Sequence, residues 1–134
     1  MTELLSNRRV WRIALVVYAI ALVTATHWPG ARVNVIPGLR LDLLIHVGAY
    51  AALAGLLALA GVGAEWRAGR AVVLIILVAS GWALIDEVTQ AIPALRRTFD
   101  LEDLGADVAG AIVGATIGVA LARRRPKADQ QSSR

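Results

Sequence analysis

Four apolar runs, each of membrane-spanning length, follow one another within a chain of 134 residues. They cover residues 10–28, 42–63, 71–92 and 104–122, and roughly 20 helical residues are enough to cross a hydrocarbon core about 30 Å thick. The chain is 57% hydrophobic, whereas soluble domains average roughly 45–50% apolar residues. Helices satisfy all of their own backbone hydrogen bonds inside lipid. We therefore predict an all-α, polytopic membrane protein that folds as one four-transmembrane-helix bundle.

The segments outside these runs set the domain boundaries. We divide the chain into a cytoplasmic head (1–9), one membrane domain (10–122) and a basic cytoplasmic tail (123–134), which we expect to be disordered because it is polar. Pro and Gly residues within 29–38 favour a loop after the first run, and Pro93 ends the third. A cleavable signal peptide is the alternative interpretation of the first run, but such peptides have a shorter apolar core of about 7–15 residues.

The charged residues are distributed unequally between the two sides that four spans define. Ten of the 14 Lys and Arg residues fall on the side that holds both termini, and the positive-inside rule assigns that side to the cytoplasm. Seven of the 10 acidic residues fall on the opposite side. Because the net charge of +4 comes from residues that flank apolar runs, we expect the lipid bilayer as a partner and no nucleic acid.

Polar and ionisable side chains gather at the outer ends of three of the runs. Such groups are costly in a membrane, at roughly 2.5–3.5 kcal/mol each on insertion scales, so they turn inward and find partners. Residues four apart share a helix face, and this spacing recurs in the second and fourth runs. We expect the groups to converge with two loop arginines, which makes the ligand-binding candidates Asp42, His46, Tyr50, Asp86, Glu87, Gln90, Arg96, Arg97, Asp103 and Asp107.

Two interpretations of this constellation are open. It is either a structural network of polar contacts that fixes the helix register, or a site for a polar ligand or for proton transfer. In a catalytic version Glu87 and His46 are the candidate acid–base pair. The chain has no cysteine, and one His is a poor ligand set for zinc, so we expect no metal and no cofactor. We expect His27, beside Trp28, to lie at the membrane interface.

Small residues recur at every fourth position in the fourth run, at Gly110, Gly114 and Gly118. They share a face with Asp103 and Asp107. Small residues allow two membrane helices to approach closely, so we predict that this face packs inward. A similar surface on the second run would consist of Gly48, Ala52 and Gly55.

Taken together, the motifs resemble the VanZ-like family of small bacterial integral membrane proteins. The resemblance rests on an acid, a His one turn later and a Tyr (Asp42, His46, Tyr50), an acid-Glu-x-x-Gln box (Asp86, Glu87, Gln90), an Arg after a Pro-containing turn (Arg96 or Arg97), and a spaced Asp-Asp-Gly pattern (Asp103, Asp107, Gly110). It covers residues 42–118. Leu43 stands where many members have Lys, which removes a cation beside Asp42, and Asp107 stands where many have Asn.

The resemblance implies a multi-pass protein of the bacterial plasma membrane with a cell-envelope role, since the family is named for a member linked to teicoplanin resistance. Our first hypothesis is an outward-facing polar pocket that binds or modulates a lipid or a lipid-linked envelope precursor. The alternatives are an intramembrane enzyme acting on a lipid-linked substrate through Glu87 and His46, and a structural or assembly subunit. A second copy of the chain is a further candidate partner.

Overall fold

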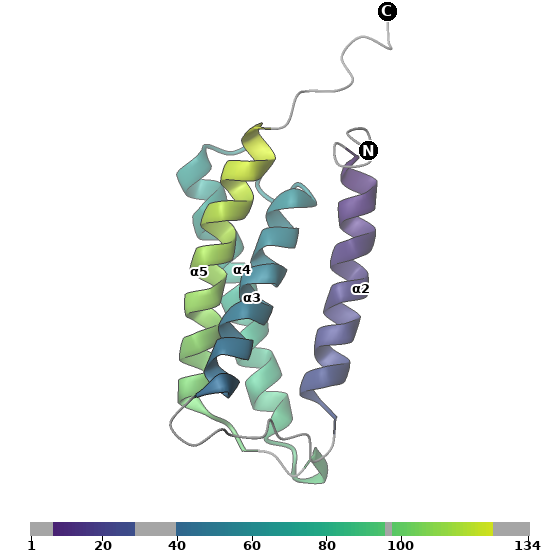
Figure 1. The fold of residues 1–134 in the computed structure, drawn as a ribbon, viewed down its shortest axis with the longest axis vertical. Coiled ribbons are helices and arrows are strands. Elements are labelled where there is room, and N and C mark those ends of the chain that lie inside the picture. The colour runs from purple at the N-terminus through teal and green to yellow at the C-terminus, as the bar shows by residue number, and fades with distance from the viewer. Residues whose placement is uncertain (1–6, 29–39, 96–97, 125–134) are drawn as a thin grey trace, which may run out of the picture.

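The computed structural model describes residues 7–28, 40–95 and 98–124, and these form four long α-helices and a short 3-10 turn. The helices are α2 (Arg8–Thr26), α3 (Leu41–Leu59), α4 (Ala68–Gln90) and α5 (Leu101–Arg124), and η1 (Pro93–Leu95) follows α4. All 4 helices are long and apolar enough to cross a membrane. No strand occurs among the described residues. The predicted all-α bundle of four spans is confirmed (Figure 1).

All four helices begin earlier than the hydropathy pattern predicts, and polar side chains cap two of them. The Asn7 side chain accepts a hydrogen bond from the Arg9 backbone N–H at 2.9 Å, so α2 begins before the apolar run. Asp100 Oδ1 accepts from the Glu102 backbone N–H at 2.8 Å, so α5 begins at Leu101 rather than at 104. Both contacts satisfy N–H groups that the first helical turn leaves without partners.

The helix ends depend on glycine and proline. Helix α3 was expected to continue to residue 63 but ends at Leu59, because Gly61 and Gly63 adopt φ values of 99° and 68°. Glycine takes up this left-handed conformation at little cost and commonly terminates helices. Helix α4 ends at Gln90, two residues short of the predicted 92 and ahead of Pro93.

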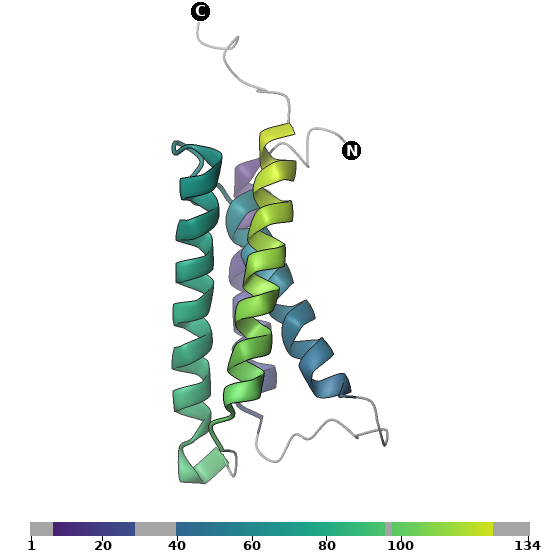
Figure 2. The same cartoon turned by 90° about the vertical axis from the view of Figure 1, so that its left-hand side faces the viewer.

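Helices α3 and α5 make the closest contact in the bundle, with α3 inclined across α5 (Figure 2). A Cβ atom added at Gly110 or Gly114 would overlap the backbone carbonyl oxygens of Val47 and Ala51, respectively. At Gly118 it would lie 2.9 Å from the Cβ of Ala58. The predicted inward packing of this glycine stripe is therefore confirmed, because only residues without a side chain fit against the α3 backbone.

The predicted partner surface on α3 is wrong in two of its three residues. A Cβ at Gly48 would meet nothing within 4 Å, and Ala52 is exposed. The surface that meets α5 begins instead at Val47 and Ala51 and continues to Gly55. The reason is the direction of His46: with about 100° per residue, Gly48 lies on the opposite side of α3 from this inward-facing side chain.

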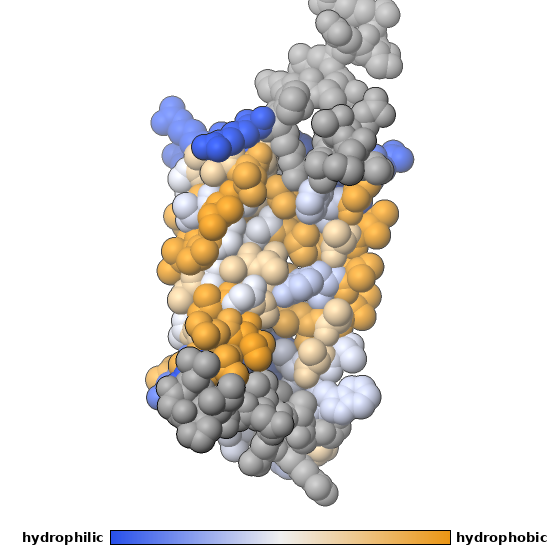
Figure 3. Space-filling view, in the orientation of Figure 1, coloured by the Kyte–Doolittle hydropathy of each residue, from blue (hydrophilic) through white to orange (hydrophobic). Residues whose placement is uncertain are grey.

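The interior is built from small residues and the exterior from large aliphatic ones. Helix α4 buries Ala71, Ile75, Ala79 and Ala83 at every fourth position. The first three pack against small residues of α3 and α5, whereas Ala83 packs in a second cluster with Leu22 of α2 and Tyr50 and Leu53 of α3. Ile13, Leu77 and Ile85 are each more than 60% exposed. Figure 3 shows one face of the bundle with mainly apolar residues between its ends and strongly hydrophilic residues at the upper end. This distribution is typical of helices packed in lipid.

Helix α2 lies at the edge of the bundle and runs beside α3 (Figure 1). Leu22 is its one buried residue. The Tyr18 hydroxyl donates a hydrogen bond to the Ala49 carbonyl of α3 at 2.8 Å. Near its other end, the Arg12 side chain donates to the Ala60 carbonyl at 3.3 Å. A few polar contacts thus hold a helix that contributes little to the apolar core.

Candidate functional site

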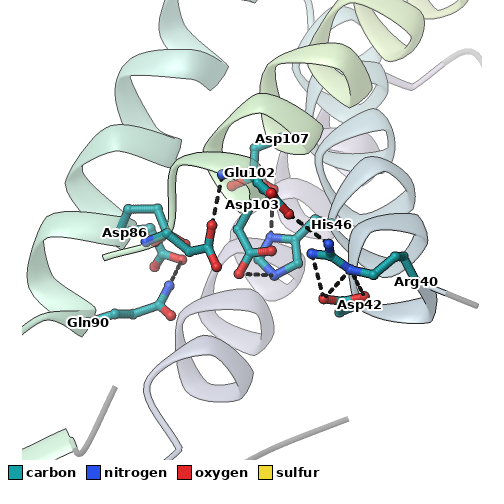
Figure 4. A network of polar contacts seen from close by, with 10 residues as sticks. Arg40, Asp42, His46, Asp86, Gln90, Glu102, Asp103 and Asp107 are labelled. Carbon is teal, nitrogen blue, oxygen red and sulfur yellow. Dashed lines mark hydrogen bonds and ion pairs between the residues drawn. The ribbon is translucent and has the colours of Figure 1, made fainter. Parts of the chain in front are cut away.

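Polar side chains concentrate where α2 and α4 end and where α3 and α5 begin, which we call the site end of the bundle (Figure 4). They fall into two groups. The histidine–carboxylate cluster consists of His46, Glu87, Asp103 and Asp107, from α3, α4 and α5. The Asp86 network consists of Thr26, His27, Asp86, Thr89 and Gln90, from α2 and α4. The two groups differ in how completely their polar atoms are paired.

His46 is the centre of the histidine–carboxylate cluster. Its Nδ1 lies 2.9 Å from Asp107 Oδ1, and its Nε2 lies 3.6 Å from Asp103 Oδ2. His46, Glu87 and Asp107 each offer one ligand atom, and these three atoms all lie within 4.8 Å of one another. Asp107 and Glu87 are each only 1% exposed. Three carboxylates therefore surround one imidazole at the site end.

Glu87 is incompletely paired. Its Oε2 accepts a hydrogen bond from the Asp100 backbone N–H at 3.0 Å. Its Oε1 is buried and has no hydrogen-bond partner among the described residues. Leaving a buried acceptor unsatisfied costs roughly 1–3 kcal/mol, and more when it is charged. The Tyr50 hydroxyl is also buried without a partner in the described part of the chain. One oxygen of the cluster, Glu87 Oε1, and the Tyr50 hydroxyl of α3 are thus polar atoms that the rest of the described structure does not use.

The Asp86 network is fully paired at its carboxylate. The Thr26 hydroxyl donates to Asp86 Oδ1 at 2.9 Å, and the Gln90 amide donates to Asp86 Oδ2 at 2.8 Å. His27 adds a contact across the same helices, with Nε2 lying 2.9 Å from Thr89 Oγ1. His27 therefore joins α2 to α4. The sequence analysis had predicted only an interfacial position for this side chain. We assign this network a structural role.

Asp42 lies at the rim of the site end and not in the histidine–carboxylate cluster. Arg40 Nη2 lies 3.3 Å from Asp42 Oδ2, and Arg40 Nη1 lies 2.7 Å from Glu102 Oε2. The hydrogen bonds that the Arg40 guanidinium donates to Asp42 and then to Glu102 raise its pKa above the ordinary value. Arg40 thus supplies the cation beside Asp42 that the Leu43 position lacks. The sequence search missed it because it stands two residues before Asp42, outside the helix.

The structure brings together some of the residues that the sequence selected and separates others. His46, Glu87, Asp103 and Asp107 converge. Asp86 faces α2 instead, because adjacent residues of one helix point about 100° apart, and Gln90 is hydrogen-bonded to Asp86 within α4. Arg96 and Arg97 lie outside the described residues. Thr26, His27 and Thr89 were not among the candidates, although the Thr-His pair closing the first run was a visible signal.

A bundle of four helices long and apolar enough to span a membrane, with buried acids and a histidine gathered at one end, defines a polytopic membrane protein. The family model that matches is VanZ/LLP1, over residues 11–122. Since this match covers all four helices, the chain belongs to the VanZ/LLP1 family. The comparisons with curated proteins and with solved structures return no match.

Proposed function

We propose that this protein lies in the bacterial plasma membrane with its site end outside, where it binds or modulates the polar headgroup of a lipid or lipid-linked envelope component. The observation that carries the proposal is Glu87 Oε1, an acceptor that is buried yet has no partner among the described residues. Glu87 is 1% exposed. An acceptor kept unpaired at this cost is ready for a donor or a cation supplied by a ligand.

The charges at the two ends support this orientation. The end opposite the site carries the arginines that open α2 and close α5, together with one in the α3–α4 connection and one in the first turn of α4: Arg8, Arg9, Arg12, Arg67, Arg70, Arg123 and Arg124. The site end carries most of the described acids. Cationic flanks remain in the cytoplasm, so both termini are cytoplasmic and the cluster faces the envelope side. An amphiphilic ligand can reach such a site with its apolar part still in the bilayer.

The test is an envelope-drug phenotype. We expect a glycopeptide-susceptible bacterium that expresses the chain to gain resistance to a teicoplanin-type glycopeptide over the vector control, and His46→Gln or Glu87→Gln to remove that gain. The control is Glu102→Gln, which makes the same chemical change on an exposed side chain at the same end. Immunoblots of the membrane fraction check that all variants are expressed equally. Full resistance in both site variants would contradict the proposal.

The His46–Asp107 contact favours a second candidate, an intramembrane enzyme. An imidazole whose Nδ1 lies 2.9 Å from a buried carboxylate is oriented for proton transfer, and Glu87 stands within 4.8 Å as the other acid–base group. This candidate predicts that purified protein hydrolyses or transfers a group on a polyprenyl-phosphate or glycolipid substrate, and that Glu87→Gln lowers the rate by about 100-fold or more. Rates equal to the no-protein blank exclude it.

A further inference from the structure

We propose that His46, Glu87 and Asp107 bind one divalent first-row transition-metal cation such as Mn²⁺. The proposal goes beyond the proposed function and does not depend on it, because the ion is bound by the protein alone. Three helices supply the ligands: His46 from α3, Glu87 from α4 and Asp107 from α5.

The spacing of the three ligand atoms suits an ion at their centre. Bonds to imidazole nitrogen and carboxylate oxygen are about 2.0–2.2 Å long, so two ligand atoms on one ion lie no more than roughly 4.3 Å apart. The three atoms here all lie within 4.8 Å of one another. A pair at this upper limit exceeds the separation of two ligands on opposite sides of one ion by only about half an ångström, which side-chain rotation can close.

The second observation is independent of spacing and concerns pairing. Glu87 Oε1 is buried without a hydrogen-bond partner among the described residues, while Oε2 is held by the Asp100 backbone N–H at 3.0 Å. One oxygen is thus anchored and the other is free to bind. Asp86, the neighbouring buried carboxylate, has both oxygens paired. Burial in this bundle does not by itself leave a carboxylate oxygen unpaired.

The charge of the cluster also calls for a cation. Glu87 and Asp107 are two buried carboxylates beside one imidazole, and buried like charges repel strongly. Arg40, the described arginine at this end, is engaged with Asp42 and Glu102 at the rim. A bound divalent ion would neutralise the two carboxylates that ligate it and leave Asp103 facing the imidazole.

The donor set decides the kind of ion. Carboxylate oxygens suit Mg²⁺, Ca²⁺ and Mn²⁺, and imidazole suits the later transition metals, so one imidazole with two carboxylates favours an ion that accepts both. The expectation of no metal came from the shortage of nitrogen and sulfur for zinc, which does not apply to such an ion. Each ring nitrogen of His46 faces a carboxylate, Nδ1 that of Asp107 and Nε2 that of Asp103. A carboxylate on the second nitrogen is the usual support of a metal-bound histidine.

The experiment uses the full chain, purified in detergent, stripped with a chelator and titrated with Mn²⁺. Binding is followed by the loss of the free-ion signal in electron paramagnetic resonance. We expect one Mn²⁺ per chain, weakened about tenfold or more in Glu87→Gln and in Asp107→Asn, and unchanged in Glu102→Gln. Pulsed measurements should detect nitrogen coupling from His46 in the wild type and lose it in His46→Gln. Monodisperse elution of each variant shows that it is folded.

Two results would overturn the proposal. One is no binding of Mn²⁺ or Zn²⁺ by the wild type at about 1 mM, which corresponds to less than roughly 4 kcal/mol of affinity. The other is equal binding by the wild type, Glu87→Gln and Asp107→Asn. A guanidinium that neutralises Glu87 instead of a metal would give the first result, together with a loss of stability in Glu87→Gln. Neither result bears on the glycopeptide-resistance phenotype, which tests the proposed function separately.

Discussion

Replacing Gly114 with alanine is expected to lower the free energy of unfolding by about 3 kcal/mol, although it adds only one methyl group. The new Cβ would overlap the backbone carbonyl oxygen of Ala51. A backbone atom cannot rotate away as a side chain can, so α3 and α5 must move apart along their length. Thermal unfolding in detergent, followed by circular dichroism, measures the loss.

The matched control is Gly105→Ala on the same helix. A Cβ at Gly105 would meet nothing within 4 Å, and alanine has a higher helix propensity than glycine by up to roughly 1 kcal/mol. We therefore expect this variant to unfold at the wild-type temperature or above. Equal unfolding temperatures for Gly114→Ala and Gly105→Ala would show that the α3–α5 contact is not close.

The second prediction compares two neighbouring acids in metal-stripped protein. Asp86→Asn should lower the free energy of unfolding by about 2 kcal/mol, because hydrogen bonds to a charged group contribute roughly 1.5–3 kcal/mol and the new amide would face the Gln90 amide. Glu87→Gln should leave stability unchanged or raise it. Its carbonyl oxygen can still accept from Asp100, and its amide places a donor where Oε1 has no partner among the described residues.

Added metal should reverse the order of wild type and Glu87→Gln. A ligand that binds only the folded state stabilises it by mass action, by about 2.7 kcal/mol at 100 times its dissociation constant. Excess Mn²⁺ should therefore raise the unfolding temperature of the wild type and not that of Glu87→Gln. If Glu87→Gln is as destabilised as Asp86→Asn without metal, then Glu87 is already satisfied and both acids are structural.

These two comparisons also address the assembly alternative. In a subunit that acts only by packing, Gly114→Ala should abolish the cellular phenotype and Glu87→Gln should not. In a protein that acts through its polar site, Glu87→Gln should abolish the phenotype at full stability. Residues at functional sites commonly carry such unfavourable arrangements at a cost in stability.

The sequence predicted the fold well because membrane length and hydropathy leave few choices. Four runs of about 20 apolar residues can be little else than four helices. The errors lie at the helix ends, which hydropathy does not define and which individual residues determine. Asn7 and Asp100 begin helices early, and Gly61 ends one early through its positive φ.

The four residues of the histidine–carboxylate cluster were all among the predicted candidates, but the sequence did not separate them from the other candidates. The cost of ionisable groups in lipid pointed to Glu87, His46 and Asp107, and these converge. Asp86 differs from Glu87 by one position, and helix rotation alone sends it to a different neighbour. That neighbour, α2, could not be identified from spacing along the chain. The arrangement of helices around α4 is three-dimensional information that no single run contains.

The glycine stripe has a consequence for the chemistry of the site. Gly110 lies less than one turn beyond Asp107 on α5, and the oxygen its missing side chain would strike belongs to Val47, the residue after His46. The direct contact between the backbones of α3 and α5 thus sets the distance between the His46 imidazole and the Asp107 carboxylate. Any side chain placed at position 110 would push the two backbones apart and so lengthen the distance between His46 and Asp107. In this molecule an absent side chain sets the spacing of the histidine–carboxylate cluster.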